Sequence, residues 1–342
     1  MLGYKSDPSV RSIQILKQAS ATLDPVNVPN ASSQQMSLGA QRQVARDFVV
    51  SGDFVYRHFI HQGLVADVNH FNSVRGPVIP QCVGAQQDDP FAQCSTGPVN
   101  VLEAAARETY KGLLLRADKR FSHGFQVLGS WAWSSNTGTN ATGTGAGPGF
   151  NLDNWLQNHG PLTQDLTHIV NLAGVKQLPW RFELGLNFTY ESIPPFSAYL
   201  GGLDLNGDGI KNDLLPGTTV DAFNRGVERS DLERLVAKFN QASAGSKDAA
   251  GAIIRPVTLP AHYSFGDNFH ALDLRLSRAF VFRERWRVSV IGEVFNLYNK
   301  ANLTGYSGDL MSAGFGQPTS RAPQVFGSGG PRAFQLAVRV GF

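Results

Sequence analysis

The sequence lacks any apolar run long enough for a membrane helix. Its 342 residues contain no stretch that approaches the ~20 consecutive apolar residues a helical span requires. The first ten residues, M-L-G-Y-K-S-D-P-S-V, also lack the apolar core of a signal peptide. We therefore expect either a protein that is not exported or the downstream part of a longer chain. A transmembrane β-barrel stays open, because half the residues of its strands face water.

Strong charge and catalytic motifs are absent as well. Thirty Lys and Arg residues against 27 Asp and Glu give a formal charge of +3, which offers no electrostatic case for nucleic acid. The sequence contains no G-x-S-x-G, no H-E-x-x-H and no phosphate-binding loop. We therefore expect no nucleic-acid partner, no enzyme and no catalytic residues. A hydrolase embedded in a barrel remains a minor alternative.

Cysteine is scarce. Cys82 and Cys94 are the only two, and they lie in one loop rich in Pro, Gly, Gln and Asp. Two cysteines that close a short polar loop favour a disulfide in an oxidising compartment, with two unrelated thiols as the alternative. Neither is near a His pair that would suggest zinc.

The sequence is rich in glycine and phenylalanine, and its apolar and polar residues alternate with period two. The 36 Gly and 22 Phe are typical of an all-β protein with long loops. In the last stretch, Pro331–Phe342, apolar residues from Phe334 to Phe342 alternate with a face that carries Gln335 and Arg339. This alternation predicts a strand with lipid outside and water inside, or an amphipathic strand of a soluble β-sandwich.

Similar alternation recurs along the chain. We expect strands at residues 9–17, 34–44, 46–58, 108–119, 124–135, 165–178, 182–191, 268–282, 285–297 and 331–342. Trp131 and Trp133, at the far end of one apolar strand face, are typical of an aromatic girdle. The sequence does not assign the facing of the 165–178 strand.

Connection lengths decide between the two architectures. Short turns near Ala45, Arg120, Pro179 and Arg283 alternate with long loops, which lie near Cys82, Gly145, Gly217 and Gly314. A Greek-key sandwich has no reason to place every long loop at one end. We therefore predict an antiparallel up-and-down transmembrane β-barrel of about ten strands, with long extracellular loops and a periplasmic C-terminus. Residues 1–33 are its poorly patterned start, and residues 34–342 form the barrel segment.

The longest connection, residues 192–267, contains two local patterns. Asp231–Asn240 has one apolar helical face, and Ser230 with Glu233 makes a predicted capping box. The run D-L-N-G-D-G-I-K-N-D places oxygen-bearing side chains at spacings that suit Ca²⁺. The candidate ligands are Asp204, Asn206, Asp208, Asn212 and Asp213. Leu215 occupies the position where an EF-hand has its bidentate Glu, so a rim Ca²⁺ loop and a plain Asx turn both remain.

Several blocks together resemble a known family. They are L-R-A-D-K-R-F-S-H-G-F-Q-V-L-G-S-W-A-W-S (Leu115–Ser134), D-L-N-G-D-G-I-K-N-D (Asp204–Asp213), L-D-L-R-L-S-R-A-F (Leu272–Phe280), E-V-F-N-L-Y-N-K-A-N (Glu293–Asn302) and the last twelve residues. In this order they resemble the C-terminal barrel half of TonB-dependent outer-membrane receptors. The similarity is greatest to the Oar-like branch, which has a carboxypeptidase-regulatory-like domain.

The resemblance implies uptake of a bulky solute across the outer membrane of a Gram-negative bacterium. Such receptors have a 22-stranded barrel, a plug domain inside it and a TonB box, whereas this sequence shows about ten strands and neither of the other parts. We therefore expect a C-terminal fragment. The alternative is a small self-contained barrel with a structural, adhesive or porin-like role.

The implied partners are outer-membrane lipid, the missing plug and barrel half, and TonB if the full-length receptor exists. The barrel-assembly machinery would recognise the strand that ends at Phe342. No cofactor is expected beyond a structural Ca²⁺. A fragment should also leave an unpaired sheet edge near residues 8–17.

Overall fold

The computed structural model describes residues 21–23, 29–67, 69–70, 80–89, 92, 94–95, 99–139, 150–153, 157–282, 285–322 and 329–342. One antiparallel sheet dominates it, and its long strands pair in chain order as a meander. These strands are β2 (Ser32–Ala45), β3 (Phe48–Asp67), β4 (Val99–Ser122), β5 (Phe125–Gly138), β7 (His168–Leu178), β8 (Phe182–Glu191), β11 (Phe269–Phe282), β12 (Trp286–Phe295) and β15 (Ala333–Gly341). The short strands β1 (Ala21–Leu23) and β6 (Gly160–Pro161) add pairs with β4 and β5. The predicted all-β up-and-down architecture is therefore confirmed.

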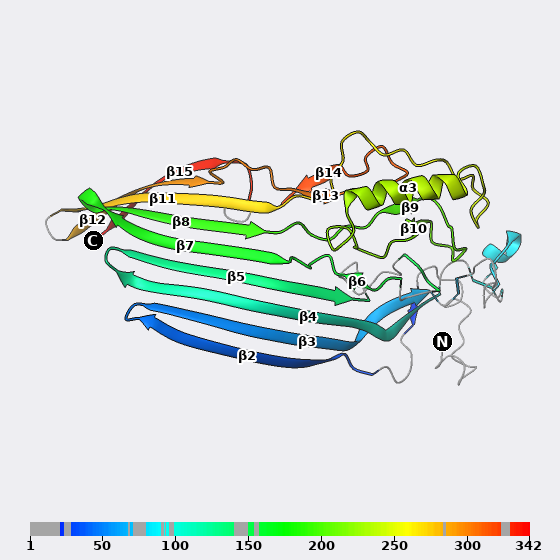
Figure 1. The fold of residues 1–342 in the computed structure, drawn as a ribbon, viewed down its shortest axis with the longest axis horizontal. Coiled ribbons are helices and arrows are strands. Elements are labelled where there is room, and N and C mark those ends of the chain that lie inside the picture. The colour runs from blue at the N-terminus through cyan, green and yellow to red at the C-terminus, as the bar shows by residue number, and fades with distance from the viewer. Residues whose placement is uncertain are drawn as a thin grey trace.

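The connections divide between the two ends of the sheet. Tight turns lie at one end, together with the C-terminus, and the long connections lie at the other (Figure 1). Two of the turns use the left-handed backbone region: His123 and Gly124 join β4 to β5, and Trp180 and Arg181 lie in the 3₁₀ turn η3 (Pro179–Arg181) before β8. The described helices are too short or too polar to cross a lipid bilayer.

Strand register assigns the two faces of the sheet. One row across it joins Val50, Ala117, Gly129, Leu172, Phe188 and Leu272. The adjacent row joins Val49, Asp118, Leu128, Ala173, Asn187 and Asp273 and therefore faces the other way. On β7, whose facing the sequence leaves open, Leu172 lies on the apolar face and Asn171 on the polar face. The ambiguity arose because apolar residues occupy both faces of this strand.

The apolar face is exposed rather than covered. Leu38 is 75% exposed and Leu336 is 87% exposed, although a β-sandwich would bury this face against a second sheet. The soluble alternative is therefore wrong, and the exposed face suits contact with lipid. Aromatic side chains mark both ends: Trp131 and Trp133 lie toward the long connections, and Trp286 contacts Phe342 at the turn end with ring centroids 5.5 Å apart.

Each end of the strand path pairs on one side only within the described residues. β2 pairs with β3, and β15 pairs with β12. The described sheet is thus open, with β2 and β15 as its edges. The strand expected at residues 9–17 and the edge expected near residues 8–17 lie outside the described residues.

Two predicted segments, a loop and a helix, have the wrong bounds. The loop expected from Phe59 to Arg107 is shorter, because β3 continues to Asp67 and β4 begins at Val99. The sequence pattern does not predict these extensions, because strand residues that extend beyond the lipid do not have to alternate between apolar and polar. The helix α3 (Arg229–Ser243) is longer than expected, and its capping box joins Glu228 and Asp231 rather than Ser230 and Glu233.

The longest connection is not structureless. Residues 192–267 and 303–322, here called the rim lobe, pack around a common apolar core (Figure 1). The largest fully buried members of this core are Leu200, Leu215, Phe223, Leu232 and Phe315. Helix α3 buries Leu232, Val236 and Phe239. Two hairpins complete the lobe: β9 (Tyr199–Gly201) with β10 (Asn212–Leu214), and β13 (Leu303–Tyr306) with β14 (Pro318–Arg321).

Candidate functional site

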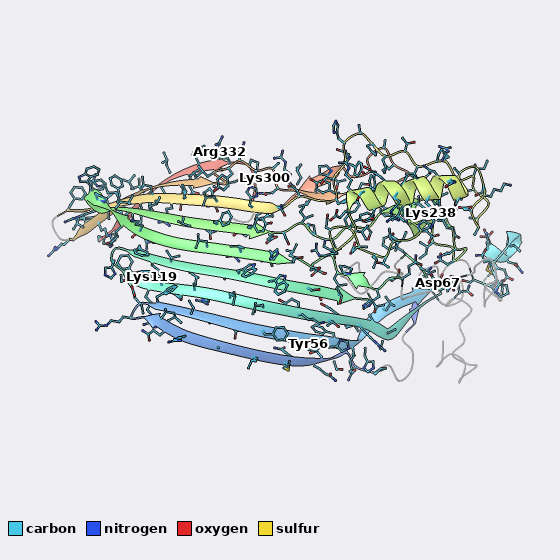
Figure 2. The ribbon with its side chains drawn as sticks, in the orientation of Figure 1. Tyr56, Asp67, Lys119, Lys238, Lys300 and Arg332 are labelled. Atoms are coloured by element: carbon cyan, nitrogen blue, oxygen red, sulfur yellow. A yellow bond between two sulfur atoms is a disulfide. The ribbon has the colours of Figure 1, made fainter. Side chains whose placement is uncertain are left out.

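The rim lobe lies at the long-connection end of the sheet and is tied to its neighbours by ion pairs. Lys300 Nζ is 2.9 Å from Asp267 Oδ1, which joins the connection after β12 to the segment before β11 (Figure 2 labels Lys300). Arg225 Nε is 2.6 Å from Oδ2 of Asp165, whose side chain is 3% exposed. A buried pair of this kind costs stability if either partner is lost, so it fixes the lobe relative to the strand ends.

The acidic loop at residues 204–213 is held by hydrogen bonds from its own backbone. The Asp204 carboxylate accepts from Gly207 N–H at 2.6 Å and from Gly209 N–H at 3.0 Å. Both glycines have positive φ, 77° and 91°, which lets the chain curl around the carboxylate. Asn206 Oδ1 accepts from Asp208 N–H at 2.9 Å, which is the geometry of an Asx turn.

The structure buries three of the five predicted ligands and leaves two exposed. Asp204, Asp208 and Asp213 are buried, whereas Asn206 and Asn212 are exposed. Burial, together with the nearby Asp208 and Asp204 charges, raises the pKa of Asp213 to about 6 against the hydrogen bonds that it accepts. In the part of the chain that the structure describes, no group of three or more His, Cys, Asp or Glu side chains is arranged to hold a metal ion. Calcium binding by this loop stays a prediction.

Calcium is expected to bind the loop with saturable heat in isothermal titration of the folded protein. A divalent ion would relieve the repulsion among carboxylates that burial has brought close. Asp208→Asn should weaken that heat. The same substitution at Asp118, on the polar face of β4, should leave it unchanged and is the matched control. No heat at millimolar Ca²⁺ would leave the loop as a plain Asx turn.

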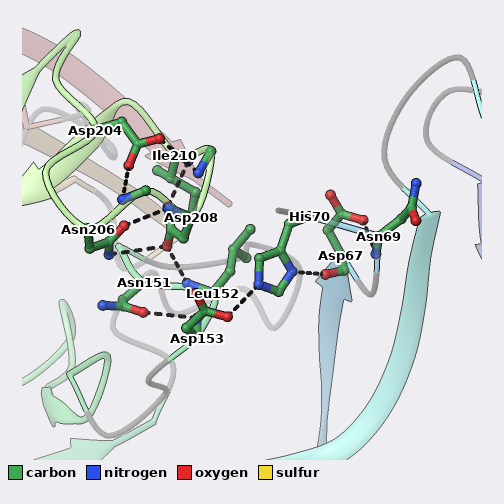
Figure 3. Close-up of polar contacts among 12 residues, drawn as sticks. Asp67, Asn69, His70, Asn151, Leu152, Asp153, Asp204, Asn206, Asp208 and Ile210 are labelled. Atoms are coloured by element: carbon green, nitrogen blue, oxygen red, sulfur yellow. Dashed lines mark hydrogen bonds and ion pairs between the residues drawn. The ribbon is translucent and has the colours of Figure 1, made fainter. Parts of the chain in front are cut away.

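A polar chain connects this loop to two other long connections (Figure 3). Leu152 N–H donates to Asp208 Oδ2 at 2.7 Å. The next residue, Asp153, lies 2.7 Å from Nε2 of His70, whose Nδ1 lies 2.5 Å from the backbone oxygen of Asp67 at the end of β3. Three connections distant in sequence thus meet at one point of the rim. No local sequence pattern predicts this contact, because His70 and Asp153 are 83 residues apart.

The cysteine loop lies at the same end of the sheet, in the connection between β3 and β4. Cys82 and Cys94 are joined by a disulfide with a Cα–Cα distance of 4.9 Å, and both side chains are buried. Ser95 N–H donates to the Pro80 oxygen, and Cys82 N–H donates to the Ser95 oxygen. The cross-link therefore closes a small hydrogen-bonded loop within the connection between β3 and β4.

The polar face of the sheet has charges of both signs. Arg275 lies 3.7 Å from Glu293 across β11 and β12, and Arg116 lies 3.2 Å from Asp118 along β4. Strand register places further charged residues on the same face: Glu183, Asp273, Arg287 and Arg339. Because the Arg116 and Arg275 side chains are more than half exposed, this face suits contact with water, as the inner face of a barrel does.

A family model described as an outer membrane beta barrel domain matches residues 4–335. A search of curated proteins finds no match.

Solved structures with a similar chain course include two from Escherichia coli. The outer membrane transporter YddB has a TM-score of 0.48 and 10% identity, over 94% of this chain and 34% of that one. The ferric-catecholate import receptor Fiu has a TM-score of 0.43 and 12% identity, over 91% and 27%. The FrpB iron transporter from Neisseria meningitidis has a TM-score of 0.40 and 10% identity, over 93% and 32%. This chain spans about a third or less of the length of each structure.

Proposed function

The chain belongs to the outer-membrane β-barrel domain family, and from this premise we propose that it is the C-terminal wall of a TonB-dependent receptor that takes up a bulky solute. The protein resides in the outer membrane of a Gram-negative bacterium. The proposal assigns transport to it and no catalytic step.

The observation that supports the proposal is the combination of an open sheet with a folded rim lobe. The described sheet is a meander with free edges at β2 and β15, so further strands can extend it from either side. The mixed charges on its polar face offer hydrogen-bonding partners to a domain inside the barrel. The rim lobe is far larger than the loops that a narrow barrel needs, and this favours a wide barrel over a small self-contained one.

The proposed partners follow from this arrangement. A plug and the remaining barrel strands would complete the lumen, and TonB would act on that plug. The barrel-assembly machinery would recognise β15, whose apolar face runs to Phe342. The sequence blocks described above support the Oar-like branch of the receptors. Calcium at the 204–213 loop would make the rim lobe more rigid without taking part in transport.

Energised uptake is the property that separates this receptor from a passive barrel. Cells that carry the gene and cells that lack it would be given a panel of fluorescent solutes, with and without an inner-membrane protonophore. We expect gene-dependent accumulation of at least one solute to collapse in the protonophore, because TonB draws on the inner-membrane proton gradient.

An antibody against α3 provides the second readout. It should detect, in outer-membrane fractions, either a polypeptide longer than 342 residues or a stable complex with a second chain. Accumulation that persists in the protonophore, with a lone 342-residue band, would contradict the proposal and favour a porin-like barrel.

A further inference from the structure

A cavity of about 550 Å³ lies where the rim lobe meets the strand ends. Glu191 at the end of β8 and Phe269 at the start of β11 form its wall side, and they are register partners on the polar face of the sheet. The lobe side includes Pro194–Ser197, Asp221 and the segment Leu303–Gly308, which contains β13. Its volume is within the usual range for pockets that hold small organic ligands.

Asp221 is the unusual residue of this cavity. It is 5% exposed and has a positive φ of 53°, a conformation that costs energy for a residue other than glycine. Its Oδ1 accepts from the Ser197 hydroxyl at 2.7 Å, and its own N–H donates to that hydroxyl oxygen at 2.7 Å. Its Oδ2 is buried and has no hydrogen-bond partner among the described residues. Burial is the main cause that raises the pKa of Asp221, to about 6, so the group is still largely ionised at neutral pH.

Arg225 acts on the Asp221 carboxyl, and Lys300 lies at the cavity wall beside Asp267, but both cations are already engaged. Arg225 bonds to Asp165 and donates to the backbone oxygens of Ile193 and Asn224, at 3.2 and 2.7 Å. Lys300 is paired with Asp267, the third carboxylate of the cavity wall. Glu191 makes no ion pair with any described residue. The cavity therefore has more negative charge than its own positive charges neutralise.

Aromatic residues also line the cavity: Phe150, Phe196, Tyr199, Phe265, Phe269 and Tyr306. Phe196 and Phe265 stack with ring centroids 5.3 Å apart. Aromatic faces attract organic cations, most strongly where water is excluded, and carboxylates attract the same charge. An anionic ligand would meet repulsion here, and a neutral one would leave the negative charge of Asp221 without a compensating positive charge.

We propose that this cavity binds an organic cation, a quaternary ammonium or amine group with an apolar body, between Asp221, Glu191 and the aromatic rings. The inference rests on the proposed uptake function in one respect, since it assigns the class of solute. The binding chemistry itself requires no energy source and no partner protein.

Benzyltrimethylammonium is the probe, measured by isothermal titration against the folded protein in detergent, with detergent alone as the blank. Benzyl alcohol and phenylacetate serve as the neutral and anionic counterparts. We expect saturable binding of the cation only, and binding at least about tenfold weaker in Asp221→Asn, because the attraction between the ligand's charge and a buried carboxylate is lost. Glu191→Gln should weaken it as well.

Asp231→Asn is the matched control. Asp231 is on the same lobe but lies on the exposed side of α3, where it pairs with Arg234 at 2.7 Å, so its loss should leave binding unchanged. Asp221→Asn should fold, because asparagine tolerates positive φ and keeps an acceptor for Ser197. Protection of the α3 amides from hydrogen exchange verifies this.

The proposal is overturned if the cation shows no saturable binding, if benzyl alcohol binds as well as the cation, or if folded Asp221→Asn binds the cation as well as wild type. The two proposals can be contradicted independently. If the cation binds but uptake resists the protonophore, the receptor function is contradicted and the cation site stands. If uptake needs the proton gradient but the cation does not bind, the cation site is contradicted and the receptor function stands.

Discussion

Leu172→Arg is expected to destabilise the folded barrel by about 2–4 kcal/mol, which is the cost of a cation on the lipid face near the bilayer midplane. Leu172 lies in the middle of β7, on the exposed apolar row between Gly129 and Phe188. Arginine there must either remain in the hydrocarbon or bend toward the interface, and both cost free energy. Denaturant titration in phospholipid vesicles, followed by tryptophan fluorescence and by heat-dependent migration on gels, measures the loss.

Asn171→Arg supplies the control on the adjacent residue. Asn171 is on the polar face and accepts one exposed hydrogen bond from Thr189 at 3.2 Å. Its replacement should change stability by no more than about 0.5 kcal/mol, as at other wet surfaces. Equal losses from the two variants would mean that the sheet does not face lipid on one side and water on the other.

The second large effect is expected in the rim lobe. Phe223→Ala should cost the lobe about 3–5 kcal/mol, because it empties a fully buried position. The Phe223 ring contacts Phe265 with centroids 4.8 Å apart and Phe196 with centroids 6.1 Å apart, so the substitution removes the centre of an aromatic cluster. Backbone hydrogen bonds between residues 196 and 223 remain. The loss therefore reports side-chain packing.

Hydrogen exchange resolves where the loss falls. Amides of α3 should lose protection in Phe223→Ala, and amides in the β7–β8 ladder should keep theirs, because the lobe has its own core. Ile253→Ala is the control, since Ile253 belongs to the same connection but is 67% exposed. A uniform loss of protection over lobe and barrel would show that the two unfold as one unit.

The helix shows how far local sequence patterns reach. The apolar spacing of Leu232, Val236 and Phe239 predicts a helix at the correct place, because residues that share a helical face are close in sequence. Its true start depends on Glu228 and Asp231, whose side chains form the observed cap. Two overlapping motifs of the same kind occur at this start, and the structure uses the one formed by Glu228 and Asp231.

What the sequence by itself determined is the membrane wall. Alternation with period two is a property of each strand alone, and connection length fixes which strands are neighbours, so the meander and its lipid face follow from local patterns. The tertiary structure alone decided the rest: the facing of β7, the His70–Asp153 contact and the cavity around Asp221. The facing of β7 depends on its register with β5 and β8, and the other two depend on residues from distant connections that meet at the rim. No periodic sequence pattern predicts contacts between distant loops, because loop residues outside the lipid do not have to alternate between apolar and polar.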